Sequence, residues 1–232
     1  MWNGKKKAIT FSYDDGVTQD IRLIELFDKY GLKATFNLNS EKLGHENKLI
    51  REGVEISHNK ICAADIRHVY ANHEIAAHTL THPNLTKIEN EAEIIRQVEQ
   101  DRLNLSELAG YEVVGFAYPC GGVNNDDRVA RIIRENTGIR YARTITQADS
   151  FDLQDNLFRF KPTAYHHMHL DELFELAERF LSLKTDKPQM LYIWGHAYEF
   201  DIFNDWARFE ELCKMISGKD DIFYGTNKEV LL

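Results

Sequence analysis

Two short segments far apart in the chain carry side chains that commonly bind metal ions. His78 and His82 lie four residues apart in His-Thr-Leu-Thr-His-Pro, and Asp14 and Asp15 are adjacent in Ser-Tyr-Asp-Asp-Gly. In one helical turn over 78–82 the two imidazoles would share a face and could meet at one ion. A catalytic site of the zinc type has three protein ligands and leaves one position open for water. One of the two aspartates is therefore the best candidate for the third ligand.

The two neighbouring carboxylates are not expected to perform the same task. Side chains of adjacent residues on an extended strand point in opposite directions. One aspartate can bind the ion while the other acts as general base on a water molecule. A proton donor must then serve the leaving group, and His196 is the natural candidate because it follows the apolar segment 189–194. These residue types together suit metal-assisted hydrolysis of a carbonyl substrate.

Composition excludes several other classes of protein. The 232 residues are 43% hydrophobic, which is enough for an ordinary core, and we expect a single domain spanning 1–232. The formal net charge of −9 argues against a nucleic-acid partner bound through phosphates. No segment approaches the ~20 apolar residues of a membrane span. No oligomeric state is indicated.

The cysteines and the start of the chain favour a cytoplasmic protein. Cys62, Cys120 and Cys213 are scattered and show no Cys-x-x-Cys spacing, so neither a disulfide framework nor a zinc–thiolate cluster is predicted. The first residues contain no apolar run typical of a signal peptide. A secreted form trimmed of its signal is the alternative.

Short strand patterns alternate with helix patterns along the chain, which indicates an α/β fold with a parallel sheet. Residues 39–72 are weakly periodic and are interpreted as an inserted surface segment with one or two short helices. The expected strands are 7–13, 33–38, 73–77, 113–117, 139–145, an irregular 158–162, 189–194 and 222–224. The expected helices are 19–30, 89–108, 126–136, 171–183 and a last one capped by Asn204 and ending near 216.

Polar residues follow the carboxyl ends of several different strands. Barrel enzymes assemble their sites on this rim, so the pattern favours a closed barrel over an open sheet. The residues at these positions are Asp14, Asp15, His78, His82, Arg143 and His196.

The motifs resemble those of the polysaccharide deacetylases, the fourth family of carbohydrate esterases. The resemblance rests on residues 10–16, residues 78–83 and the apolar strand that ends in Trp194-Gly195-His196, and it extends from residue 7 to about 226. It implies a distorted (β/α)7 barrel that hydrolyses N-acetyl, or sometimes O-acetyl, groups and releases acetate. It also implies roles for five residues: Asp14 as base, His196 as acid, and Asp15, His78 and His82 as metal ligands.

The third motif departs from the family pattern. The family usually places an arginine before the proline of this motif to orient the base, but Ala117 precedes Tyr118-Pro119-Cys120 here. Arg143, at the end of the next strand, is the expected replacement, and Arg159 is the alternative. The backbone N–H of Cys120 can still form an oxyanion hole, since that role needs no particular side chain. Tyr118 and Pro119 are expected to help orient the substrate beside it.

The fourth motif also departs, because the family's aspartate and tryptophan beside the acid histidine are missing. Asp149 or Asp152 could supply the carboxylate, and Trp194 or Tyr165 could supply the aromatic wall. Three more histidines follow in the same region and are expected on the surface or in contact with substrate: His166, His167 and His169.

The sequence thus predicts a deacetylase that acts on an acetylated sugar or oligosaccharide. Its cofactor would be a divalent metal, with zinc first and cobalt, nickel, iron or manganese as alternatives. A first alternative function is an amidohydrolase of the same fold that acts on a small linear or cyclic amide. A second is a descendant that binds carbohydrate without catalysis, although such a protein would have no use for both a base and an acid.

Overall fold

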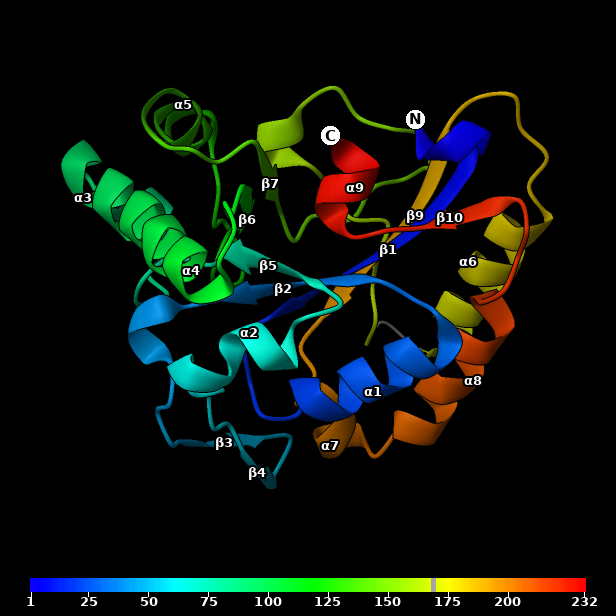
Figure 1. Ribbon diagram of the computed structural model, residues 1–232, viewed down its shortest axis with the longest axis horizontal. Helices are drawn as coiled ribbons and strands as arrows, with labels where there is room; N and C mark the ends of the chain where they lie inside the picture. Colours follow the sequence, from blue (N-terminus) through cyan, green and yellow to red (C-terminus); the bar gives the residue numbers. More distant parts are fainter. Residues whose placement is uncertain (168–169) are drawn as a thin grey trace.

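A curled sheet of eight strands forms the centre of the molecule in the computed structural model, which describes residues 1–167 and 170–232 (Figure 1). The strand order is β7-β6-β5-β2-β1-β9-β8, β10 also pairs with β1, and every pairing in this sheet is parallel. The bounds are β1 Lys7–Asp14, β2 Ala34–Leu38, β5 Glu74–Ala77, β6 Gly115–Ala117, β7 Tyr141–Arg143, β8 Ala164–Tyr165, β9 Gln189–Gly195 and β10 Ile222–Tyr224.

The irregular segment 158–165 closes the sheet into a barrel. The N–H of Phe160 donates to Ala142 on β7 at 2.9 Å, and the N–H of Thr144 donates back to Phe160 at 2.8 Å. Further along the same segment, the N–H of Thr163 donates to Tyr192 on β9 at 2.8 Å. One stretch of chain therefore bridges the two edges of the sheet. The predicted fold, a distorted (β/α)7 barrel in a single domain, is confirmed.

Helices cover the outside of the barrel and bury their apolar faces against it (Figure 1). Phe27 and Leu23 lie on the buried face of α1, which ends at Gly31 in the left-handed conformation that glycine adopts easily. Phe27 packs against Phe11 of β1 with ring centroids 4.6 Å apart. The helices are α1 Asp20–Tyr30, α2 Ile66–Val69, α3 Glu91–Ile95, α4 Asp101–Ala109, α5 Asp127–Asn136, α6 Leu170–Ser182, α7 Glu199–Phe203, α8 Trp206–Ile216 and α9 Asn227–Leu231.

The segment 39–72 contains a β-hairpin that was not predicted. Strands β3 (Lys48–Arg51) and β4 (Val54–Ser57) pair antiparallel, and α2 is its one α-helix. The hairpin turn places both Glu52 and Gly53 at positive φ, as the tightest hairpin turns require. Glutamate is uncommon in this conformation, which hid the turn in the sequence. The hairpin packs against α7 and lies at the same edge of the molecule (Figure 1).

The end of the chain differs from the prediction at two places. Asn204 does not begin the last long helix but ends α7 in the left-handed conformation, with φ of 53°. Asparagine tolerates this conformation better than most residues. The short helix α9, which starts with a capping box between Thr226 and Glu229, was not predicted. None of the helices in the described ranges is long and apolar enough to cross a membrane.

Replacing Phe11 by alanine tests the packing between β1 and the outer helices. The side chain is fully buried and touches the rings of Phe27 and Phe209. We expect the free energy of unfolding in urea to fall by about 3–5 kcal/mol. Ile50→Ala is the matched control, because that side chain is 70% exposed on the hairpin. A loss at Phe11 no larger than at Ile50 would contradict this account of the core.

Candidate active site

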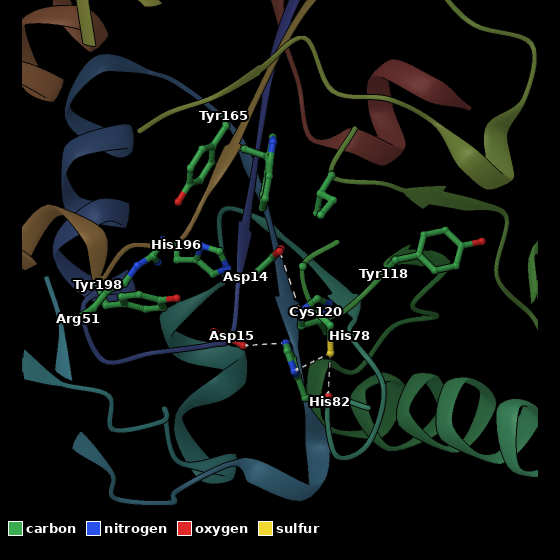
Figure 2. A pocket seen from close by; sticks show the side chains of 13 residues that line it. Asp14, Asp15, Arg51, His78, His82, Tyr118, Cys120, Tyr165, His196 and Tyr198 are labelled. Carbon is green, nitrogen blue, oxygen red and sulfur yellow. Dashed lines mark hydrogen bonds and ion pairs between the residues drawn. The ribbon is translucent and has the colours of Figure 1, made fainter. Parts of the chain in front are cut away.

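A cavity of about 340 Å³ opens at the carboxyl ends of the barrel strands (Figure 2). Seven of the nine predicted site residues line it: Asp14, Asp15, His78, His82, Tyr118, Cys120 and His196. The other two, Arg143 and Pro119, are buried behind its wall. The barrel therefore brings together residues that are up to 182 positions apart in the chain.

The segment from His78 to His82 is a tight loop, and the predicted helical turn was wrong. Thr79 and His82 both have positive φ, 70° and 67°. The side-chain amide of Asn39 donates to the carbonyl groups of His78 and Thr79, at 2.6 and 2.9 Å, and holds this unusual backbone. Pro83 disfavours a helical turn that includes His82, because a residue before proline avoids the right-handed helical conformation. The two imidazoles still face one another, with ring centroids 4.9 Å apart.

Asp15, His78 and His82 surround a common centre. Each offers a ligand atom, and these atoms lie within 4.8 Å of one another. The Oδ1 of Asp15 and the Nε2 of His82 are 3.6 Å apart, close to the ~3.4 Å between neighbouring ligands of a tetrahedral ion with bonds of about 2.1 Å. The Nδ1 of His78 is 2.8 Å from the carbonyl of Ala117, which fixes the tautomer and leaves Nε2 for an ion. The donor set suits a divalent metal.

The charge states of these residues also suit metal binding. Burial, together with the nearby His78, lowers the pKa of His82 to about 4, so its imidazole is neutral at pH 7. Burial alone would raise the pKa of Asp15, but the neighbouring His58 imidazole, whose Nε2 is 3.4 Å from Oδ2, and the charge of Lys60 hold it well below its usual value. A neutral imidazole and an ionised carboxylate are the forms that bind metals.

Helix residues behind the loop fix its position. The buried carboxylate of Asp101 accepts hydrogen bonds from the N–H of His78 at 2.9 Å and of Ser40 at 2.7 Å. One turn earlier, the carbonyl of Gln97 accepts from the N–H of Leu80 at 3.0 Å. Gln97 lies in a π-helical turn, Arg96–Gln100, between α3 and α4. Such turns often mark functional sites, and this one brings the carbonyl of Gln97 and, just after it, the carboxylate of Asp101 to the histidine loop.

Asp14 lies beside this loop, with its Oδ2 4.0 Å from Nε2 of His78, and is paired with Arg143. The guanidinium donates to Oδ1 of Asp14, and its face packs over the ring of Trp194 at 4.7 Å. Asn37 donates to the same oxygen at 2.8 Å. Burial would raise the pKa of Asp14, but the charge of Arg143 lowers it below its usual value, so the carboxylate is ionised. The alternative, Arg159, instead pairs with Asp127 at 2.6 Å on the surface.

A glutamate that the sequence analysis missed supports His196. Glu199 is 1% exposed, and its Oε2 is 3.2 Å from Nδ1 of His196 and 2.8 Å from Nε2 of His166. Its Oε1 accepts from Nη1 of Arg51 at 2.8 Å and from the hydroxyl of Tyr165. Burial alone would lower the pKa of His196, but the charge of Glu199 raises it to about 9. The imidazole is therefore protonated at pH 7.

The expected carboxylates in this region were wrong. Asp149 and Asp152 are both exposed, and Asp152 contacts Gln189 at the opposite end of β9. The spacing His196-x-x-Glu199, which places both residues on one side of a helical turn, was the available signal.

The histidines that follow β8 do not form the predicted surface set. His166 is buried beneath the site, where its ring fills the space that a Cβ on Gly195 would need. His167 stacks on Phe203, with ring centroids 3.5 Å apart, and does not line the cavity. His169 lies outside the described residues.

The third motif forms another wall of the cavity. Cys120 has φ of 71°, and its carbonyl accepts from the side chain of Asn124 at 2.8 Å. Tyr118 is anchored by its hydroxyl, which donates to the carbonyl of Phe158 at 2.8 Å. Trp194 and Tyr165, the two predicted aromatic residues, line the cavity, and so do two residues that sequence reasoning missed, Arg51 and Tyr198.

Comparison with known proteins identifies the family. A model described as polysaccharide deacetylase matches residues 2–142, more than half of the chain. No match was found among curated proteins.

Solved structures share the fold at low identity. A family 4 carbohydrate esterase pseudoenzyme from Bacillus anthracis is 19% identical with a TM-score of 0.56, covering 100% of this chain and 67% of that one. A family 4 carbohydrate esterase from Streptomyces lividans, solved with acetate, is 13% identical with a TM-score of 0.57, covering 96% and 92%. The peptidoglycan deacetylase PdaC from Bacillus subtilis is 16% identical with a TM-score of 0.55, covering 99% and 91%. With the family model and the motifs described above, these matches show that the chain belongs to the polysaccharide deacetylase family.

Proposed function

We propose that this protein is a metal-dependent deacetylase that hydrolyses an N-acetyl group, or an O-acetyl group, of a carbohydrate and releases acetate. One observation carries the proposal. The Asp15–His78–His82 triad shares a cavity with an ionised Asp14 and a protonated His196. A base and an acid beside one metal-binding set are what hydrolysis of an acetyl group requires.

Each residue has a task in this reaction. A divalent ion, zinc first among the candidates, would be held by Asp15, His78 and His82 and would supply Lewis-acid activation of water and the acetyl carbonyl. Asp14 takes a proton from the attacking water, and Arg143 keeps it ionised and oriented. The new C–O bond forms and the C–N bond breaks. His196 gives its proton from Nε2 to the leaving amine, since Glu199 occupies the Nδ1 side.

The backbone at Cys120 completes the proposed site. Its N–H is the oxyanion donor, and among the described residues no hydrogen bond is donated by this group. A fixed backbone donor stabilises the tetrahedral intermediate without reorganisation. Tyr118 and Pro119 orient the segment that carries it.

A second candidate function is hydrolysis of a small linear or cyclic amide. The cavity volume of about 340 Å³ favours a small substrate, such as one sugar ring or a molecule of similar size. A non-catalytic role, as in the pseudoenzyme of similar fold, is disfavoured because Asp14 and His196 each retain a charged partner.

Acetate release is the direct test of the proposed function. Metal-loaded protein should release acetate from N-acetylglucosamine or its short oligomers, and a chelator should abolish the release. Asp14→Asn should lower kcat at least a hundredfold, since general base catalysis contributes roughly 10²–10⁴-fold. Asp149→Asn, on an exposed carboxylate, is the control. Hydrolysis of a small amide without acetate release from any acetylated sugar would favour the second candidate.

Metal content tests the ligand triad separately from activity. Asp15→Ala and His78→Ala should each lose most of the bound metal measured by elemental mass spectrometry, because a two-ligand site binds weakly. His45→Ala removes an exposed histidine and should leave the content unchanged. Circular dichroism shows whether each variant is folded. Unchanged metal in both triad variants would rule out this site.

The pH profile tests the pair formed by Glu199 and His196. The protonated imidazole is the active acid, so activity falls as pH rises through the pKa of His196, which the charge of Glu199 raises. Glu199→Gln removes the negative charge that raises this pKa, so the basic limb of kcat/KM should move to lower pH. Glu211→Gln, on the exposed face of α8, is the control. If the basic limb of kcat/KM does not move in Glu199→Gln, then His196 is not the group whose titration sets that limb.

A further inference from the structure

The cavity gathers basic side chains although the chain as a whole is acidic. Three carboxylates at the site, those of Asp14, Asp15 and Glu199, face four cations. These cations are Arg143, Lys60, Arg51 and the protonated His196. A divalent ion in the triad would add two more positive charges, whereas the chain carries a net charge of −9. A concave site of one sign concentrates ligands of the opposite sign.

Arg51 is the cation placed to contact a ligand directly. Arg143 and Lys60 are buried behind the aspartates, whereas the Arg51 side chain is 41% exposed and lines the cavity. In Figure 2 it lies with Tyr198 and His196 on the side of the cavity opposite Cys120 and His82.

The guanidinium of Arg51 is held in place before any ligand binds. Its Nη1 donates to the buried Glu199 at 2.8 Å, and β4, the partner strand of Arg51 in the hairpin, packs against α7, which begins with Glu199. A guanidinium carries five N–H donors, so further donors remain for a ligand. Its planar, fixed arrangement matches the two oxygens of a carboxylate better than it matches a neutral hydroxyl.

We propose that the cavity selects acetylated sugars that carry a carboxylate, and that Arg51 binds this carboxylate. The inference rests on the proposed function for the acetyl group, whereas the anion preference follows from the residues of the cavity. Arg51 acts as a specificity-determining residue, and the hairpin that carries it is the segment that interrupts the barrel between β2 and β5.

The test compares sugars that differ by one carboxylate. N-acetylglucosamine is the neutral probe, N-acetylmuramic acid adds a carboxylate at O3, and 2-acetamido-2-deoxyglucuronic acid carries one at C6. With metal-loaded protein, kcat/KM for at least one acidic sugar should exceed the neutral value by about tenfold or more, as for a hydrogen bond to a charged group. In Arg51→Gln the values of kcat/KM for the acidic and the neutral sugar should become about equal. Arg51→Lys should keep part of the preference for the acidic sugar.

Two controls make the result specific to Arg51. Lys48→Gln removes a cation from the same strand at an exposed position and should leave the ratio unchanged. The ratio within Arg51→Gln also cancels any effect on His196 through Glu199, because both sugars use the same acid. No preference for either acidic sugar, or a preference that survives Arg51→Gln, would overturn the inference.

Binding of the deacetylated sugars decides the inference even if no acetate is released. Glucosamine, muramic acid and 2-amino-2-deoxyglucuronic acid are not turned over, so calorimetry on metal-loaded protein gives their affinities directly. We expect the acidic amines to bind more tightly than glucosamine by the same factor, and we expect this difference in affinity to disappear in Arg51→Gln. Failure to release acetate from any sugar would count against the proposed function, whereas equal affinities for the three amines would count against the role of Arg51.

Discussion

The buried ion pair between Asp14 and Arg143 is the interaction on which the rest of the site depends. Asp14 ends β1, the strand that pairs with β2, β9 and β10, and Arg143 ends β7 at the far edge of the sheet. Removing one partner of such a pair leaves an uncompensated buried charge, at a cost of about 3–5 kcal/mol. The pair therefore requires the sheet to curl until its edge strand reaches the central one. The closure by 158–165 and the ion pair between Asp14 and Arg143 therefore support one another in the folded structure.

A second buried pair, formed by Glu199 and His196, gives the opposite protonation state. Arg143 keeps Asp14 ionised, whereas Glu199 keeps His196 protonated, although burial opposes the charged form in both cases. The site therefore presents a proton acceptor and a proton donor at the same pH, which pairs of titratable groups in different environments commonly achieve. Gly195 contributes indirectly, because its missing side chain lets His166 approach Glu199 from below.

The sequence predicted those site residues that end apolar strands and missed those in turns. Asp14 ends one strand and His196 directly follows another, and both strands are rich in apolar and aromatic residues, so the position of the two residues on the rim could be inferred. Glu199 begins a five-residue helix, and Arg51 belongs to a hairpin whose turn contains a glutamate at positive φ. Neither position has a periodic pattern around it. The loop at His78 replaces the predicted helical turn because the side chain of Asn39 binds its carbonyl groups and Pro83 disfavours a helical His82, and the spacing of the two histidines shows neither effect.

Where this chain lacks a residue of the family pattern, another residue supplies the same charge. That residue lies at a different place in the sequence but near the same place in the barrel. Ala117 stands where the family usually has an arginine, and its register partner across the β6–β7 pairing is Arg143. An arginine moved by one strand at the same level of the barrel can still reach Asp14, because strands lie about 4.8 Å apart and the side chain is longer than that. Glu199 likewise supplies the carboxylate for His196 from its own following helix. The chemistry requires each charged group to lie at a given place around the cavity. In a closed barrel, side chains from several different strands can reach the same place.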